Sequence, residues 1–474
     1  MASNPTSPLS STVRAWRTRS LLSIERQLLD HHDGLVAGQK LAQATDSMLR
    51  GVGKRLALPT RDLAIVAVGG YGDGLLAPHS DLDLLLITRS NPEAAFADST
   101  PSAQLLYALW DAGLKLGYSI HSPASLLEAC SNLDTRTSML SARHIWGDRT
   151  LLESIDTTPP NLPRFVRDKF DERDARHLRY GDSRYVLQPD VKEGKGALRD
   201  LHTVSWLMRA CEGHNDLDRL KADGVITNAE VALFRRAQRF LMAVRAHCHL
   251  ISKRQENVLR FDLQPEIASR MNYRTKQGKN TEAARLHATE RFMRNYYWSV
   301  KEVGNLTRTV CTLLEARHKK STVAISLQSH VVVEGFPIAN GRIDFPDSEI
   351  TPQRIMQLFR VAHRRQCKFT PECLRTVRRY APRFVAARHE PSIVQDLMAI
   401  LCPVPRIQFW QKRGLRSPHR QRVVDSPEHY LRVMSESGVL GRMLPDFGRI
   451  IASMQYDNYH VYTNDEHTIR AIGI

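Results

Sequence analysis

Apolar and polar residues alternate at helical spacing over most of the chain. The pattern covers residues 12–50 and, almost without a break, residues 161–320; it resumes at 351 and continues to the last residue. Apolar residues three or four positions apart lie on one face of a helix, so these stretches predict amphipathic helices.

Short apolar runs rich in β-branched residues and leucine interrupt this pattern between the first two helical stretches. LAIVAVGG (63–70) and DLDLLLIT (81–88) predict two buried strands, and GYSIHS (117–122) predicts a third. SAQLLYALWDAGLKL (102–116) lies between them at helical spacing. The order strand, loop, strand, helix, strand predicts a small mixed sheet with flanking helices.

A second interruption contains an Asn-Gly pair, in VVVEGFPIANGRIDF (331–345), and predicts a β-hairpin. The whole pattern therefore predicts an α+β protein that is predominantly helical. We expect five parts: an N-terminal helical arm (1–50), the domain with the mixed sheet (51–160), a helical domain (161–320), a linker and helical region with the hairpin (321–425), and a last part (426–474).

The composition of the chain indicates which kinds of protein it can be. No run approaches the roughly 18 apolar residues of a membrane span, so no membrane segment is predicted. The net charge of +17 favours an anionic partner, although many arginines between 351 and 422 have the spacing of an exposed helix face. The seven cysteines are scattered without a CxxC pair, which predicts neither a disulfide framework nor a cysteine zinc site and fits a cytoplasmic protein.

Two carboxylates interrupt the second predicted strand. Side chains two residues apart in a strand project from the same face, so Asp81 and Asp83 are expected to converge while Leu82 and Leu84 face the core. Converging carboxylates repel one another unless a cation lies between them. Mg²⁺ is the candidate, because it takes one or two carboxylates and completes its coordination with phosphate oxygens.

The loop before this strand begins with two glycines. Without side chains, Gly69 and Gly70 let their backbone N–H groups approach a triphosphate, and Ser80 adds a hydroxyl donor beside the predicted metal site. A Gly-Gly turn followed by D-x-D on the next strand is typical of the nucleotidyltransferase fold, in which two metal ions assist transfer. The alternative, that Asp81 caps a turn and Asp83 is a surface residue, is weaker because the two motifs occur together.

The stretch GGYGDGLLAPHSDLDLLL (69–86) resembles the GGYGRGEL-P-x-SDIDLL motif of the bacterial PII uridylyltransferase/uridylyl-removing family. LQPDVKEGKGALRDLHTVSW (187–206), QRFLMAVRAHCHLISKRQENVLRFDLQPEIA (238–268) and ERFMRNYYWSVKEV (290–303) resemble further segments of that family. The likeness spans about 50–474. It implies transfer of UMP from UTP to a tyrosine of the nitrogen-signalling protein PII, with Mg²⁺ as cofactor and without a nucleic-acid partner.

The chain departs from the family pattern at several positions. Asp73 stands where the family usually has Arg, which predicts weaker nucleotide binding because an anion replaces a cation beside the triphosphate. Lys195 and Ala197 replace the Pro and one Gly of the family's GpGG. Two interpretations of 187–206 stay open. Either its basic residues contact phosphate or PII, namely Lys192, Lys195, Arg199 and His202, or Arg199 and Asp200 only tie the loop to the sheet domain.

A third carboxylate usually completes such a site. The candidates are Asp134 and Glu128, with Asp111 on a predicted helix as a weaker one, and spacing does not decide among them.

Residues 438–473 resemble the beginning of the family's HD phosphohydrolase domain, with His467 in the position of its first metal ligand. One histidine does not make a hydrolytic metal centre. We therefore expect an incomplete HD domain over 426–474, loose packing of its apolar residues, and neither uridylyl-removing activity nor the family's glutamine-sensing ACT domains. His460 is expected to be a surface residue.

Two other functions remain possible from the sequence. One is nucleotidyl transfer to a different acceptor, either glutamine synthetase or the 3′ end of an RNA. The other is a non-catalytic remnant that binds PII or nucleic acid, which the replacement at Asp73 would explain.

Overall fold

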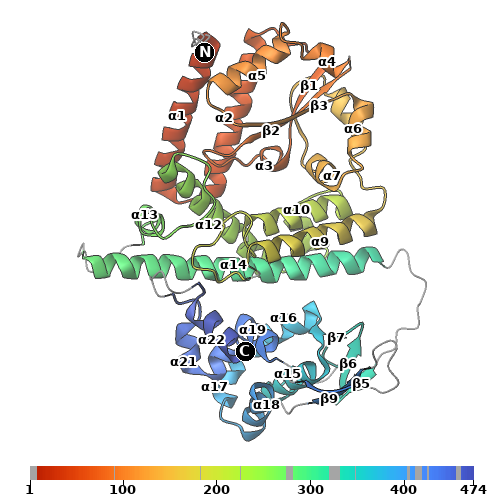
Figure 1. The fold of residues 1–474 in the computed structure, drawn as a ribbon, viewed down its shortest axis with the longest axis vertical. Helices are drawn as coiled ribbons and strands as arrows, with labels where there is room; N and C mark the ends of the chain where they lie inside the picture. The colour runs from red at the N-terminus through yellow and green to blue at the C-terminus, as the bar shows by residue number, and fades with distance from the viewer. Residues whose placement is uncertain are drawn as a thin grey trace. The chain divides into compact units, whose positions relative to one another are not determined.

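The computed structural model describes residues 8–473 except 90, 182, 225, 274–280, 320–330, 347–348, 403–405, 411–418, 424–425 and 455–460. The chain forms two compact units, and most of its described residues are helical (Figure 1). Unit 1 comprises Met1–Arg184 and Gln188–Lys319; unit 2 comprises Tyr185–Leu187 and Lys320–Ile474. The finer division into five parts remains a prediction.

Unit 1 begins with two long helices, α1 (Pro8–His31) and α2 (Gly34–Arg55), followed by a four-stranded sheet. The strands are β1 (Leu63–Ala67), β2 (Leu82–Thr88), β3 (Leu116–His121) and β4 (Arg143–Gly147). The helices between and after them are α3 (Gly69–Gly72), α4 (Pro92–Ala95), α5 (Pro101–Asp111), α6 (Pro123–Ala129), α7 (Leu133–Met139) and α8 (Thr150–Glu153).

The sheet has the strand order β3-β2-β1-β4. Strand β1 is antiparallel to β2 and β4, whereas β2 and β3 are parallel, so the predicted mixed sheet is confirmed. Alternate residues of β1 and β2 enter a core on one face, where Val66, Leu85 and Ile87 pack against Leu126 of α6 and Leu151 of α8. Strand β4 was not predicted.

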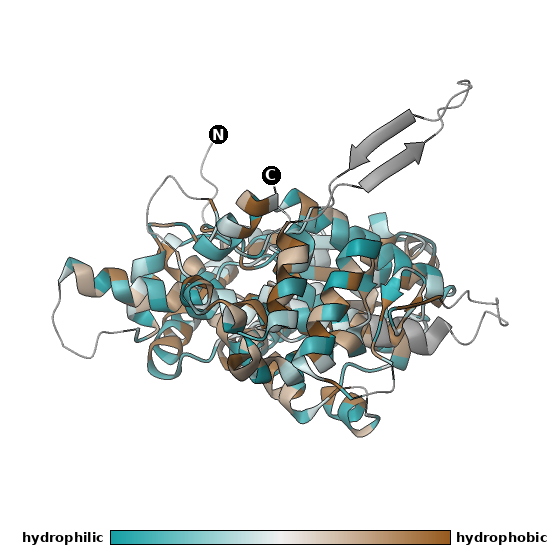
Figure 2. Ribbon diagram, turned by 90° about the horizontal axis from the view of Figure 1, so that it is seen from below, coloured by the Kyte–Doolittle hydropathy of each residue, from teal (hydrophilic) through white to brown (hydrophobic). Residues whose placement is uncertain are grey.

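The remainder of unit 1 is helical, as its periodicity predicts. Figure 2 shows hydrophilic (teal) and hydrophobic (brown) residues mixed along the helices of the chain. The helices are α9 (Leu162–Arg179), α10 (Leu198–Glu212), α11 (Leu217–Ala222), α12 (Asn228–Ser252), α13 (Gln264–Arg270) and α14 (Glu282–Lys319).

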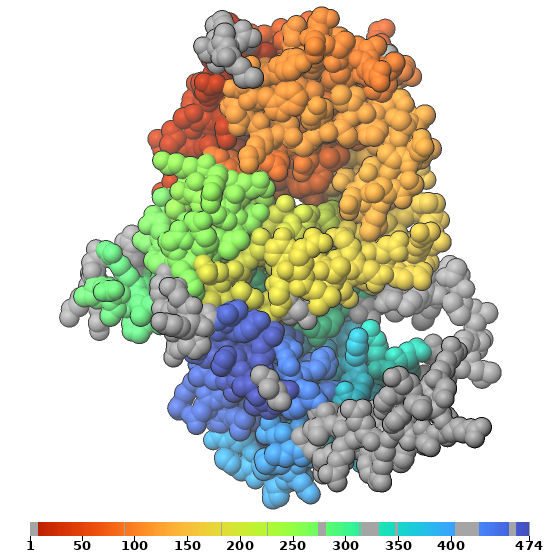
Figure 3. Space-filling model, in the orientation of Figure 1, coloured from red at the N-terminus to blue at the C-terminus, as the bar shows by residue number. Residues whose placement is uncertain are grey.

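Helix α12 connects the helical part of unit 1 to α2. Thr227 and Glu230 form a capping box that fixes the start of α12. Where α2 crosses α12, a Cβ on Gly34 would lie 1.9 Å from the backbone nitrogen of Ala243, so only glycine permits the crossing. The residues of the sheet domain and those of α9 and α10 adjoin on the face of unit 1 drawn in orange and yellow in Figure 3. This arrangement brings residues far apart in the sequence to one end of the sheet.

Unit 2 contains a second four-stranded sheet, a two-stranded sheet and a group of helices. The first sheet comprises β5 (Val331–Val333), β6 (Phe336–Ala339), β7 (Arg342–Ile343) and β8 (Lys368–Phe369), and the second β9 (Arg406–Trp410) and β10 (His419–Val423). The helices are α15 (Pro352–Arg365), α16 (Pro371–Tyr380), η1 (Ala381–Arg383), α17 (Phe384–Ala387), α18 (Pro391–Leu401), α19 (Glu428–Ser437), α20 (Leu440–Met443), α21 (Pro445–Ile450) and α22 (Asn464–Gly473).

The predicted hairpin is confirmed: Asn340 and Gly341 form its turn with φ of 51° and 67°, the conformation that an Asn-Gly pair adopts readily. The prediction of unbroken helical structure after 351 is wrong, because β8, β9 and β10 lie there. The prediction of loose packing at 438–474 is also wrong for Val439 and Ile469, which are buried in the core of unit 2. The incomplete HD domain remains a prediction, and His460 lies outside the described residues.

Within the part of the chain that the structure describes, no helix combines the length and the apolar character needed to cross a membrane.

Candidate active site

Strand β2 places Asp83 at its beginning, with Asp81 just before it. Leu82 and Leu84 are buried, at 4% and 1% exposure, whereas both aspartates are half-buried. Neither carboxylate makes a hydrogen bond or an ion pair with any described side chain or backbone group. A half-buried pair of acids without a protein partner is costly unless a ligand supplies positive charge.

The backbone around Asp83 is shaped by two glycines from different segments. Gly69, the first residue of α3, has a φ of +59°, and a Cβ there would lie 3.2 Å from Oδ2 of Asp83. Gly117, which pairs with Asp83 across β2 and β3, would place a Cβ only 2.6 Å from Oδ1. These two positions therefore confine the carboxylate from both sides.

Gly70 is different, because packing within the chain does not require a glycine there. A Cβ at Gly70 would meet only the carbonyl oxygen of Leu75, at the ordinary contact distance of 3.6 Å. The missing side chain thus leaves the backbone of the turn open to a ligand.

A buried network fixes the glycine turn from beneath. The hydroxyl of Tyr71 donates to Asp46 Oδ1 at 2.7 Å, and Arg143 of β4 donates to the same carboxylate and to the carbonyls of Tyr71 and Gly72. Burial and Asp46 both raise the pKa of Tyr71, so its hydroxyl stays protonated and continues to donate. This connection between α2 and β4 was not predicted from the sequence.

Three cations from the helical part of unit 1 act electrostatically on Asp83. Lys192 precedes α10, Arg199 lies in its first turn, and Arg245 lies near the end of α12. All three lower the pKa of Asp83, which burial and the negative charge of Asp81 nevertheless hold above its ordinary value. Lys192, Arg199 and Arg245 therefore surround Asp83 electrostatically, although none forms an ion pair with it in the structure.

Burial and mutual repulsion disfavour the charged forms of two of these cations, Arg245 and Lys192. Burial lowers the pKa of Arg245 to about 10, with Arg199 adding to the effect, and burial followed by Arg199 and Arg245 lowers that of Lys192. Arg245 is 7% exposed and donates to the neutral Oδ1 of Asn257 at 3.0 Å. Such clustering of partly compensated cations favours an anionic ligand. Arg245 was missed in the sequence analysis, because only the packing of α12 brings it here.

The segment before α10 is held rigidly. Asp200 accepts hydrogen bonds from Arg176 at 2.6 Å, His177 at 2.9 Å and the backbone of Gly196 at 2.8 Å. Its pKa is far below the ordinary value because these groups outweigh its burial. Arg199 donates twice to Glu193, within the same segment. Asp200 therefore ties the segment to α9 and not to the sheet domain. Contact of Lys192 and Arg199 with phosphate or PII remains a prediction.

The two aspartates fit a magnesium ion. None of Asp134, Glu128 and Asp111 joins them, and no group of three or more His, Cys, Asp or Glu residues in the described ranges could hold a metal. Two half-buried carboxylates without a protein partner are nonetheless the set that Mg²⁺ accepts when phosphate oxygens supply further ligands.

Ser80 and Asp73 differ from their expected roles. The hydroxyl of Ser80 donates to the carbonyl of Ala77 at 2.9 Å, so contact with a nucleotide would require it to exchange that bond. Asp73 forms an ion pair with Arg209 of α10. The anion at this position is thus neutralised by a cation from another helix, and the repulsion expected from the sequence is removed. The binding roles of Ser80, Gly69 and Gly70 remain predictions.

Comparisons with known proteins show which enzymes the chain is similar to. Residues 164–311 match the family model described as GlnD PII-uridylyltransferase. Proteins named bifunctional uridylyltransferase/uridylyl-removing enzyme from Novosphingobium aromaticivorans, Rhodospirillum rubrum and Caulobacter vibrioides are 40%, 39% and 38% identical over 87% of this chain. The chain is a homologue of these enzymes.

The homology confirms the resemblance inferred from the motifs. The chain spans less than half the length of each of these three enzymes: 44%, 42% and 43%, respectively.

Proposed function

We propose that the protein transfers UMP from UTP to a tyrosine of the PII signalling protein. The observation that supports this most directly is the pair of unpartnered carboxylates, Asp81 and Asp83, opposite three cations beside an open glycine turn. UTP and PII as partners, and the cytoplasm as the compartment, come from the family resemblance and the cysteine pattern.

In this proposal each group has a defined task. Asp81 and Asp83 hold Mg²⁺, which when bound offsets negative charge on the triphosphate. Lys192, Arg199 and Arg245 bind phosphate oxygens and stabilise the charge that develops on the leaving pyrophosphate. The backbone N–H groups of Gly69 and Gly70 position the triphosphate beside them.

The transfer itself exchanges one phosphate ester for another. The tyrosine oxygen forms a bond to the α-phosphorus of UTP, the bond from that phosphorus to the bridging oxygen breaks, and pyrophosphate leaves. The phenolic proton passes to Asp81, to Asp83 or to a third carboxylate that is not yet placed.

Incubation of the protein with PII, Mg²⁺ and α-labelled UTP, ATP or CTP tests the proposal. We expect label on PII from UTP alone. Asp83→Asn should reduce the rate at least about 1,000-fold, because metal stabilisation contributes several kcal/mol, whereas Asp62→Asn, at an exposed acid before β1, should not change it. Label on RNA or glutamine synthetase would support a different acceptor, and no label anywhere would support a non-catalytic protein.

A further inference from the structure

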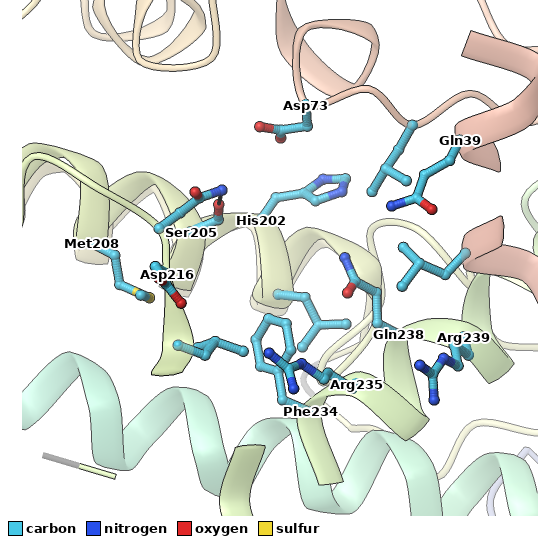
Figure 4. A pocket seen from close by; sticks show the side chains of 15 residues that line it. Gln39, Asp73, His202, Ser205, Met208, Asp216, Phe234, Arg235, Gln238 and Arg239 are labelled. Carbon is cyan, nitrogen blue, oxygen red and sulfur yellow. Dashed lines mark hydrogen bonds between the residues drawn. The ribbon is translucent and has the colours of Figure 1, made fainter. Parts of the chain in front are cut away.

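A cavity of about 320 Å³ lies in unit 1, beside the candidate active site (Figure 4). Helices α2, α10 and α12 and the residues that follow α3 form its walls. Its volume is within the range of pockets that bind small molecules. None of the proposed catalytic groups lines it.

The cavity borders the glycine turn directly. Two of its wall residues, Asp73 and Leu75, donate backbone hydrogen bonds of 3.0 Å to the carbonyls of Gly69 and Gly70, respectively. A triphosphate over these glycines would therefore have its remaining portion close to the mouth of the cavity.

Helices α10 and α12 each carry one of the cations and residues of the cavity wall. On α10, Arg199 is followed by His202 and Ser205; on α12, Arg245 is preceded by Gln238. With a rise of 1.5 Å per residue, Ser205 and Gln238 lie about 10 Å along their helices from the respective arginine. A nucleoside triphosphate similarly places its phosphates at one end and its base at the other.

The polar groups of the cavity have unused hydrogen-bonding capacity. Figure 4 shows His202, Gln238 and Gln39 directed toward the same space. None of these three side chains makes a hydrogen bond within the described parts of the chain. Burial, with Arg199 and Arg245, lowers the pKa of His202 to about 3, so its neutral ring both donates and accepts. Leu201 and Phe234 supply apolar surface for a flat ring.

We propose that this cavity binds the nucleoside of the substrate, with the amides of Gln39 and Gln238 and the ring of His202 facing the uracil and ribose. The inference rests on the proposed function and extends it from the triphosphate to the base. An uracil edge alternates carbonyl acceptors with one N–H donor, and the amide group of glutamine complements that pattern.

Binding of two ligands, measured calorimetrically with Mg²⁺, separates the cavity from the phosphate site. UTP carries a nucleoside, and inorganic tripolyphosphate does not. Gln238→Leu should weaken UTP binding about 10-fold, the effect of one lost hydrogen bond, and leave tripolyphosphate binding unchanged. Ser205→Phe, which fills the cavity, should weaken UTP binding further. Gln43→Leu, one turn beyond Gln39 on the exposed face of α2, is the matched control.

Unchanged UTP affinity in both Gln238→Leu and Ser205→Phe would overturn the inference, as would an equal loss for both ligands. Asp83→Asn should weaken the binding of both UTP and tripolyphosphate, because Asp83 acts at the phosphate end. If the unmodified protein binds no UTP and labels no acceptor, the proposed function fails together with the inference. If it binds UTP in an Asp83-dependent manner that the cavity variants do not alter, only the inference fails.

Discussion

At the scale of single residues, the sequence reveals groups whose relation is local. Asp81 and Asp83 are two positions apart, just before and at the beginning of β2, so the alternation of a strand sufficed to predict that they lie together. Gly117 adjoins Asp83 and Arg245 acts on it electrostatically, yet both relations depend on strand register or helix packing over long sequence separations. No pattern within a short window contains that information.

Gly117 offers a test of the position of Asp83. In Gly117→Ala the new methyl group would lie 2.6 Å from Oδ1, and the carboxylate is the part able to move. We expect kcat for labelling of PII to fall about 10- to 100-fold, as misplacement of a catalytic group by about 1 Å does, with little change in melting temperature.

Gly51→Ala is the matched control for this variant. Gly51 lies in α2 with no atom within 4 Å of a Cβ, so alanine should leave activity unchanged and stabilise the protein by about 0.5–1 kcal/mol. Full activity in Gly117→Ala would show that Asp83 does not need its present position.

The ion pair of Asp73 and Arg209 gives a second prediction at this scale. Asp73 is buried, and burial raises its pKa despite the opposing effect of Arg209. Arg209→Met should therefore destabilise the protein by about 3 kcal/mol, because it leaves a buried acid without its partner. Asp73→Asn combined with Arg209→Met should recover most of the loss.

Urea unfolding of both single variants and the double variant measures the coupling. Strictly additive free energies would mean that the pair contributes nothing as a pair. The family arginine expected at 73 was visible as a departure in the sequence, but its replacement partner on α10 was not.

At the scale of elements, strands with strong periodicity were predictable, and segments defined by tertiary contacts were not. β1, β2 and the hairpin of β6 and β7 follow from β-branched runs and an Asn-Gly turn. Strand β4 was missed because RHIWG has neither clear alternation nor a flanking hairpin turn; it pairs with β1 from about 80 positions away, with a register shift between Ile65 and Val66. Strand β4 supports the glycine turn through Arg143, which forms an ion pair with Asp46.

The segment before α10 provides the prediction at this scale. Gly196 has a φ of +79°, and a Cβ there would lie 2.1 Å from the carbonyl oxygen of Val300 on α14. Gly196→Ala should therefore displace the segment that carries Lys192 and destabilise the protein by about 2–4 kcal/mol. UTP affinity should fall with it.

Gly213→Ala isolates the effect of backbone conformation. Gly213 ends α10 with a φ of +74°, but a Cβ there meets nothing within 4 Å. Gly213→Ala should lower the free energy of unfolding by only about 1 kcal/mol and leave UTP affinity unchanged. Equal effects of the two substitutions on unfolding and binding would contradict a specific role for the contact with α14.

At the scale of the whole molecule, buried histidines couple folding to pH. Burial is the main reason that the pKa values of His202, His247 and His249 are each lowered to about 3. Their pKa in an unfolded chain is about 6.5. Above that value the histidines are neutral in both states. As the pH falls below it, the unfolded chain takes up protons that the folded chain does not, so the folded state becomes less stable.

Each such histidine lowers the free energy of unfolding by about 1.4 kcal/mol per pH unit between roughly pH 6 and pH 3. We expect the melting temperature to be nearly constant from pH 8 to pH 7 and to fall steeply from pH 6.5 to pH 5.5. Tryptophan fluorescence follows unit 1, because only Trp410 of the 6 tryptophans belongs to unit 2.

His247 allows one of the three contributions to be removed without touching the proposed site. Both of its ring nitrogens are buried without a partner among the described residues, so His247→Leu removes an unsatisfied polar group as well as a titrating one. The variant should be more stable than the parent at pH 7 and lose the part of the pH slope that His247 contributes. His287→Leu, at an exposed histidine of α14 outside the buried three, is the matched control. A slope unaffected by His247→Leu would mean that its protonation does not distinguish the folded from the unfolded chain, and that the acid sensitivity of unit 1 originates in its carboxylates, above all the network around Asp200.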